Sequence, residues 1–182
     1  MLCNNCYIFH STNNNNLMSI LNDKILYANK YILDKYRRLA NQEKLPYIYT
    51  SMYLSGSIDD NFGPALLFDP NILKKESFIF NYGWSVHPNE QSIYVSASDD
   101  IESKENKLKI IIENIKTSKK ITDYEILFVG RILLEDYLVG VLCPKCNDEK
   151  IDEIKTLLNK SKLKNVKIYR SNKLPAINMS LF

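Results

Sequence analysis

The sequence lacks any apolar run of membrane-spanning length, for which roughly 20 consecutive apolar residues are needed. It also lacks the basic region followed by an apolar segment that marks a secretory signal, since it begins Met1-Leu2-Cys3-Asn4. Internal repeats and linker-like stretches are absent as well. We therefore expect no membrane association, a cytoplasmic location (the host-cell cytoplasm for a viral protein) and a single domain over residues 1–182.

A strong charge of either sign is also missing. The 24 Lys and Arg residues nearly balance the 21 Asp and Glu residues, which leaves a net charge of +3. This charge neither indicates nor excludes a nucleic acid partner. The fractions of hydrophobic residues (45%) and charged residues (25%) are ordinary for a globular protein with a sizeable core.

Cysteine is scarce, but its four copies form two Cys-x-x-Cys pairs, Cys3/Cys6 and Cys143/Cys146. Two thiolates at this spacing are typical of half a tetrahedral zinc site, and two pairs would complete a four-sulfur site that ties distant segments together. In a reducing cytosol, metal binding is favoured over a disulfide. Four free thiols are an alternative that the sequence favours as much as a zinc site. A redox pair is disfavoured because neither pair opens a helix in a thioredoxin-like context.

Apolar periodicity predicts an α+β domain whose extended mixed or antiparallel sheet is flanked by helices. Strands are expected at residues 6–10, 47–53, 65–68, 77–80, 92–96, 125–129, 137–142 and 166–169, and helices at 14–21, 30–42, 99–116 and 147–158. We expect strand 137–142 to form a hairpin with strand 125–129. Helix 99–116 is expected to turn Ile101, Leu108, Ile111, Ile112 and Ile115 inward.

Glu125 stands at the start of a strand that reads as part of the core. The residues from Ile126 to Val129 are all apolar, so both faces of this strand are expected to be covered. Asp123 and Glu125 share one face, about 7 Å apart. A carboxylate at such a position costs free energy unless it is solvated, paired or used. Solvated acids at a helix-to-strand junction are therefore the alternative to a functional carboxylate.

Three short motifs, in this order, resemble the ADP-ribosyltransferase-fold superfamily. They are Tyr7-Ile8-Phe9-His10-Ser11-Thr12, Tyr49-Thr50-Ser51 and Asp123-Tyr124-Glu125-Ile126-Leu127-Phe128, each at an expected strand. Within that superfamily, nearly the whole chain resembles the DarT-type DNA-modifying toxins and their relatives. DarT-type enzymes carry an arginine in the region of the second motif, whereas residues 47–55 contain none.

The resemblance implies a single ADP-ribosyltransferase-like domain with a split mixed or antiparallel sheet, and NAD as the substrate. It also implies the site residues: Glu125 and Asp123 as catalytic, and His10, Ser11, Thr12, Tyr49 and Ser51 as NAD contacts. In this interpretation His10 meets the NAD ribose and Glu125 is the main carboxylate. Asp123 orients an acceptor or is merely solvated.

These residue types suit the chemistry that the resemblance implies. Loss of nicotinamide from NAD leaves an oxocarbenium-like ribose, as in glycoside cleavage. A fixed carboxylate stabilises that charge and accepts a proton from the incoming nucleophile. The sequence therefore predicts an NAD-dependent mono-ADP-ribosyltransferase that acts on a nucleic acid or protein acceptor. The alternative is a catalytically inactive module on the same fold, which binds a nucleotide or a partner, with or without a structural zinc ion.

Overall fold

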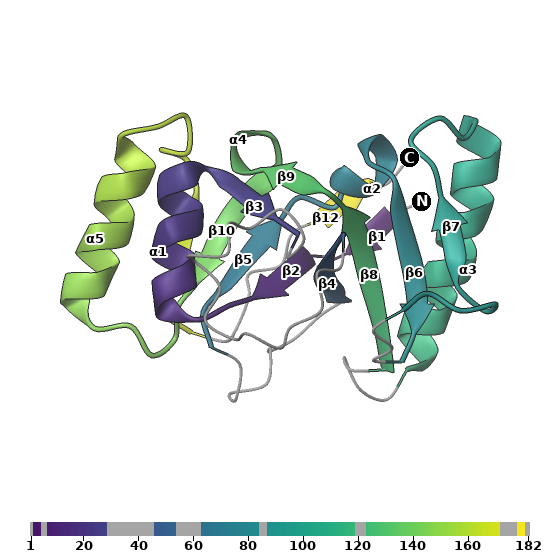
Figure 1. Ribbon diagram of the computed structural model, residues 1–182, viewed down its shortest axis with the longest axis horizontal. Helices are drawn as coiled ribbons and strands as arrows, with labels where there is room; N and C mark the ends of the chain where they lie inside the picture. The colour runs from purple at the N-terminus through teal and green to yellow at the C-terminus, as the bar shows by residue number, and fades with distance from the viewer. Residues whose placement is uncertain are drawn as a thin grey trace.

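The computed structural model describes residues 2–4, 7–28, 46–53, 63–83, 87–118, 123–171 and 178–180 (Figure 1). For residues 2–4, 53 and 178–180 it describes the backbone alone. In chain order the elements are β1 (Leu2–Asn4), β2 (Tyr7–Ser11), α1 (Asn14–Asp23), β3 (Ile25–Tyr27), β4 (Tyr47–Tyr53), β5 (Ala65–Phe68), α2 (Ile72–Lys75), β6 (Phe78–Tyr82), β7 (Ile93–Val95), α3 (Ile101–Thr117), β8 (Tyr124–Val129), β9 (Arg131–Leu133), α4 (Leu134–Tyr137), β10 (Leu138–Leu142), α5 (Asp148–Asn159), β11 (Lys167–Tyr169) and β12 (Asn178–Ser180).

Eight of these strands form one sheet in the order β11-β10-β5-β2-β4-β8-β6-β7. Only the β10–β11 pair within this sheet is parallel, so the sheet is mixed. Two small antiparallel pairs, β1–β12 and β3–β9, accompany it. Helices α1 and α5 lie side by side at one end of the molecule, and α3 lies against β7 at the other end (Figure 1). The predicted α+β architecture with a mixed sheet and flanking helices is confirmed.

Side-chain caps start each of the three long helices. Asn13 accepts a hydrogen bond from the backbone N of Asn16 at 2.9 Å, Asp100 from that of Ser103 at 2.8 Å, and Asn147 from that of Lys150 at 2.9 Å. Each bond satisfies a backbone donor that the first helical turn leaves without a partner. These caps explain why the helices begin where polar residues precede the apolar periodicity.

The two faces of the sheet differ in composition. One face contributes Ile8, Ile48, Phe80, Ile126 and their neighbours to the main core. The other face carries a smaller cluster over the β10-β5-β2 half, made of Tyr7, Phe9, Ala65, Leu67 and Leu142. Over the β4-β8-β6 half that second face carries the polar residues Ser51, Asn81 and Glu125 beside the buried apolar residues Ile79 and Leu127. The second face is therefore where a polar site can form.

Three expectations about the core strands and helix α3 were wrong. The strand at Leu138–Leu142 pairs with β5 and β11 rather than with β8, because β9 and α4 separate it from β8. Val129 is 52% exposed, since it is the last residue of β8. Ile101 is 74% exposed because it opens α3 immediately after the cap, where the helix has not yet met the sheet.

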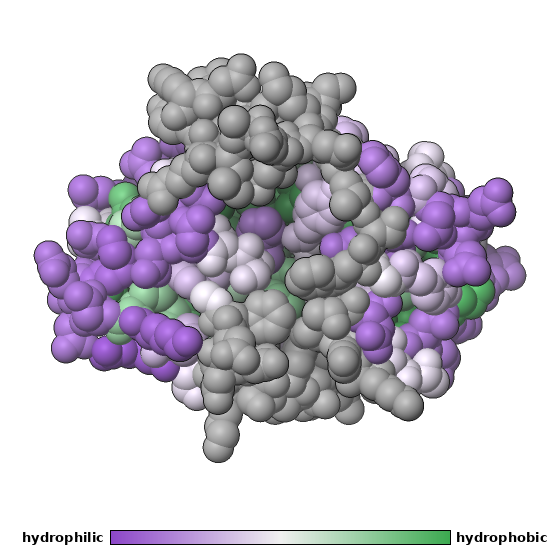
Figure 2. All heavy atoms as spheres, turned by 60° about the horizontal axis from the view of Figure 1, so that its bottom comes forward, coloured by the Kyte–Doolittle hydropathy of each residue, from purple (hydrophilic) through white to green (hydrophobic). Residues whose placement is uncertain are grey.

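The helix expected at residues 30–42 lies outside the described residues, as does Trp84. Within the part of the chain that the structure describes, no helix is long and apolar enough to cross a membrane. Figure 2 shows the molecule of Figure 1 turned so that its bottom comes forward, and hydrophilic residues predominate at the end formed by α1 and α5.

Candidate functional site

Glu125 lies on β8, an interior strand between β4 and β6, and stands opposite Asn81 of β6 in the register. Its side chain is half-buried, and its Oε2 atom is buried without a hydrogen-bond partner among the described residues. Burial raises the pKa of Glu125 to about 7, and a hydrogen bond from Asn81 opposes the rise. A carboxylate oxygen held in this way costs stability, which indicates a functional role rather than a structural one.

The strand that carries Glu125 is fixed on both sides. The hydroxyl of Thr50 on β4 donates to the carbonyl of Ile126 at 2.7 Å, and Thr50 is almost fully buried. The hydroxyl of Tyr124 donates to the carbonyl of Met52, also on β4. These bonds hold the start of β8 against β4, so Glu125 projects from a rigid strand rather than from a loop.

His10 is tied to the neighbouring strand through its ring. Its Nδ1 atom lies 2.8 Å from the carbonyl oxygen of Tyr49. Because a carbonyl only accepts, Nδ1 carries the proton, and in the neutral ring Nε2 is an acceptor. Burial lowers the pKa of His10, so the imidazole is neutral at pH 7.

The three predicted motifs lie on adjacent strands, with β4 between β2 and β8. Phe9 pairs with Ser51, and Thr50 pairs with Ile126, so Ser51 and Glu125 face the same side of the sheet, one step beyond the paired residues. Tyr49 lies two residues along the same face, opposite Leu127. Strands β2 and β8 are about 10 Å apart, two strand spacings.

His10 occupies a different position relative to this face. It follows Phe9, the last residue of β2 that pairs with β4, and by alternation it belongs to the opposite side of the sheet. Its ring reaches the Tyr49 backbone at the point where the two strands cease to pair. Asp123 immediately precedes β8 and is exposed. The structure thus groups Glu125, Ser51 and Tyr49 on one side of the sheet and assigns His10 to the other side, with its ring at the Tyr49 backbone.

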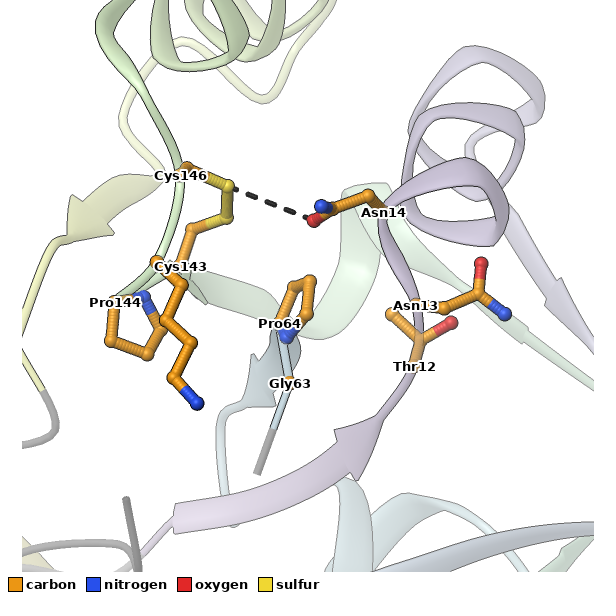
Figure 3. Close-up of a pocket in the computed structure, with 9 residues that line it drawn as sticks. Thr12, Asn13, Asn14, Gly63, Pro64, Cys143, Pro144 and Cys146 are labelled. Carbon is orange, nitrogen blue, oxygen red and sulfur yellow. Dashed lines mark hydrogen bonds between the residues drawn. A yellow bond between two sulfur atoms is a disulfide. The ribbon is translucent and has the colours of Figure 1, made fainter. Parts of the chain in front are cut away.

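A cavity of about 280 Å³ begins where β2 ends (Figure 3). Thr12 and Asn13 line it on one side, Gly63 and Pro64 at its base, and the Cys143–Cys146 turn on the other side. The backbone N of Thr12 donates to the carbonyl of Pro64 at 2.8 Å. A Cβ atom on Gly63 would come within 2.9 Å of the Thr12 carbonyl, so this close approach requires glycine. Ser11, exposed at the end of β2, precedes the cavity.

Cysteine side chains are described for the second pair alone. Cys143 and Cys146 form a disulfide in the turn before α5, and the Sγ atom of Cys146 lies 3.8 Å from Oδ1 of Asn14 (Figure 3).

The described residues contain no group of three or more His, Cys, Asp and Glu side chains that could hold a metal. Cys6 and the side chain of Cys3 lie outside the described residues. A zinc ion bound by all four cysteines accordingly stays a prediction.

One residue of the candidate site was missed at the sequence level. Asn81 is fully buried beside Glu125, yet the sequence analysis did not select it. A signal was present, because Asn81 is the one polar residue in the otherwise apolar and aromatic strand Phe78–Tyr82. A buried amide in such a strand needs partners, and it often marks a site.

The fold is shared with solved structures of Thermus sp. 2.9 DarT. The complex of that protein with carba-NAD+ matches with a TM-score of 0.55 at 12% identity, over 90% of this chain and 94% of that chain. Its complex with NAD+ matches with a TM-score of 0.54 at 13% identity over 90% and 95%, and its complex with ADP-ribosylated ssDNA with 0.53 at 14% over 90% and 92%. The predicted ADP-ribosyltransferase-like fold is confirmed at this level.

A longer structure gives a weaker match. Thermosipho africanus DarTG in complex with ADP-ribose has a TM-score of 0.48 at 13% identity, over 90% of this chain and 49% of that chain, so this chain spans about half the length of that protein. A search among curated proteins gives no match. The model of one family, described as a family of unknown function (DUF5846), matches residues 3–118, which include His10 and Asn81 and end before Glu125. Because this match covers more than half of the 182 residues, the chain belongs to the DUF5846 family.

Proposed function

We propose that this protein is an NAD-dependent mono-ADP-ribosyltransferase in which Glu125 is the catalytic carboxylate. The observation that carries the proposal is the buried Oε2 atom of Glu125, which has no partner among the described residues and projects from an interior strand. The shared fold supports it, because the Thermus DarT structures that match hold NAD+ and carba-NAD+.

The proposed reaction exchanges one bond at the ribose C1′ carbon for another. The bond from C1′ to the nicotinamide nitrogen breaks, and nicotinamide leaves with the electron pair. The ionised Glu125 stabilises the positive charge that develops on the ribose. The acceptor nucleophile then bonds to C1′, and its proton passes to the carboxylate. A carboxyl group whose pKa is about 7 is well suited to exchanging a proton near neutral pH.

The predicted NAD contacts have supporting roles in this proposal. The neutral ring of His10 accepts a hydrogen bond from a ribose hydroxyl through Nε2, because Nδ1 is committed to the Tyr49 carbonyl. The aromatic ring of Tyr49 offers a stacking face to nicotinamide, and Ser51 lines the same face of the sheet. Ser11 and Thr12 follow His10 and lead to the 280 Å³ cavity, which Thr12 lines. In this proposal the site extends from the sheet into that cavity.

The acceptor in this proposal is a nucleic acid or a protein. One matching structure is of Thermus DarT with ADP-ribosylated ssDNA, which makes single-stranded DNA the first acceptor to test. The small net charge of +3 and the absence of arginine from residues 47–55 keep protein acceptors in the comparison. Asp123, which is exposed before β8, orients the nucleophile in this proposal.

Transfer of labelled ADP-ribose from NAD to a mixed-sequence ssDNA oligonucleotide and, separately, to proteins of a cell lysate tests the proposal. The wild type is expected to label one of the two, and Glu125→Gln to reduce the rate at least about a hundredfold, in line with the loss of one electrostatic stabiliser. Glu149→Gln, an exposed glutamate of α5, is the matched control and should label like the wild type.

Equal labelling by the wild type and Glu125→Gln would refute the catalytic assignment. The alternative, an inactive nucleotide- or partner-binding module, predicts no labelling by any variant. Thermal unfolding with millimolar NAD then separates the two forms of the alternative, because only a nucleotide-binding module is stabilised by NAD. Elemental analysis of the purified protein tests the four-cysteine zinc prediction independently.

A further inference from the structure

A hydrogen-bonded chain leads from the 87–92 turn to the candidate catalytic carboxylate. The backbone N of Asn89 donates to Oγ of Ser92 at 2.8 Å, and Ser92 Oγ lies 2.8 Å from Oδ1 of Asn81. Asn81 is fully buried and lies opposite Glu125 in the β6–β8 register, where its side chain is hydrogen-bonded to the carboxylate. Asn89 and Ser92 in the turn and Asn81 on β6 thus form a chain of hydrogen bonds that ends at the Glu125 carboxylate.

The chain has a direction that follows from its donors and acceptors. Ser92 Oγ already accepts the proton of the Asn89 amide, so its own single proton is available for Oδ1 of Asn81. With Oδ1 occupied, the NH₂ group of Asn81 faces Glu125. A flipped amide would bring Oδ1 against the carboxylate, and two acceptors would then face each other. Ser92 therefore determines which end of Asn81 meets Glu125.

We propose that Asn81 is a positioning residue for Glu125, and that Ser92 fixes the orientation of Asn81. This inference rests on the proposed function and deepens it. By donating to the carboxylate from β6, Asn81 sets its rotamer and leaves Oε2, which has no described partner, directed to the reacting ribose. A bond of this kind to a charged group is stronger than one between neutral groups.

The ionisation of Glu125 gives this inference a readout beyond protein stability. On the strands that adjoin Glu125, Asp123 and Tyr49 are titratable groups on its own face of the sheet, and Tyr82 on β6 faces the other side. None of them contributes to the raised pKa of Glu125, which reflects burial, opposed by the hydrogen bond from Asn81. Loss of that bond should therefore move the pKa upward.

The test compares Ser92→Ala, Asn81→Ala and the control Gln91→Ala by kcat and KM for cleavage of NAD with the acceptor found above, from pH 5.5 to 9. Gln91 is exposed in the same turn, and only its backbone bonds to Asn89. Ser92→Ala and Asn81→Ala are expected to lower kcat about tenfold, to leave KM for NAD within about twofold, and to move the acid limb of the kcat/KM profile to higher pH. Gln91→Ala should leave both constants and the profile unchanged.

Three results distinguish failure of this inference from failure of the proposed function. If Glu125→Gln is inactive while Ser92→Ala and Asn81→Ala keep the wild-type kcat and pH profile, the positioning role is wrong and the function stands. A rise in KM with an unchanged kcat also overturns it, since Asn81 would then bind substrate directly. Activity that survives Glu125→Gln overturns the proposed function itself. Ser92→Ala keeps the test valid if Asn81→Ala does not fold.

Discussion

Replacing Glu125 with glutamine is expected to stabilise the protein at alkaline pH while it removes activity. The carboxyl group has a pKa of about 7 in the folded protein, against an ordinary value of 4.5. Because the folded-state pKa is raised, the folded protein binds this proton more tightly than the unfolded chain does. The stabilisation is therefore complete below pH 4.5 and is lost as the pH rises to about 7.

The size of the effect follows from the pKa difference. A rise from 4.5 to about 7 corresponds to roughly 3.4 kcal/mol at about 1.36 kcal/mol per pH unit. Since the side chain is only half-buried, solvent screening reduces this figure, and we expect about 2 kcal/mol. Glutamine has nearly the same shape and no charge, so Glu125→Gln should gain this amount above pH 7.5 and almost none at pH 4.

Urea unfolding of the wild type and Glu125→Gln at pH 4, 6 and 8 measures this difference, with Glu149→Gln as the exposed control. The free energy of unfolding should differ between wild type and Glu125→Gln increasingly from pH 4 to 8, while the control tracks the wild type. A difference that is constant across this range would refute the reasoning, because it would reflect packing rather than ionisation. Greater stability with less activity is the pattern expected of a functional carboxylate.

Three further predictions concern other residues. His10 should titrate well below the ordinary histidine value of about 6.5 in NMR spectra assigned with His10→Gln, because its ring is buried, and an ordinary midpoint would contradict this. Gly140→Ala should lower the free energy of unfolding in urea by about 1–3 kcal/mol, since the new Cβ would lie 2.7 Å from the ring of Tyr169. In a Tyr169→Ala background part of this loss should be recovered, and an equal loss in that background would exclude the clash. Lys104→Met should cost about 1–3 kcal/mol in the same assay, because the buried ammonium group donates to two backbone carbonyls at 2.8 and 2.7 Å, whereas the exposed Lys116→Met should have almost no effect.

The sequence was most informative where local pattern and tertiary structure agree. The strands Tyr47–Tyr53 and Ala65–Phe68 have the predicted bounds, because each is a short apolar or alternating run followed by polar residues. Pairing between strands was less predictable. The strand Leu138–Leu142 pairs with β5, which precedes it by about 70 residues, and no local pattern specifies such a partner.

The candidate site could be predicted in outline but not in its hydrogen bonding. Glu125 was selected because a carboxylate at the start of a core strand is costly unless it is solvated, paired or used, and His10 because the first motif resembles that of the ADP-ribosyltransferase-fold superfamily. The role of Asn81 depends on a register with β8 and on a serine eleven positions further along the chain. Likewise, the backbone carbonyl of Tyr49 sets the tautomer of His10. Every residue type has such a carbonyl, so the sequence does not indicate this contact.

The central place of β4 in the sheet has a consequence for the folding pathway. The contacts that join it to its neighbours span 39 residues from His10 to Tyr49 and 76 residues from Thr50 to Ile126. Contacts so distant along the chain close large loops, which slows folding to the millisecond-to-second range of β-rich domains. Because no local segment contains both Thr50 and Ile126, the candidate site around Glu125 forms only after segments far apart in the sequence have paired.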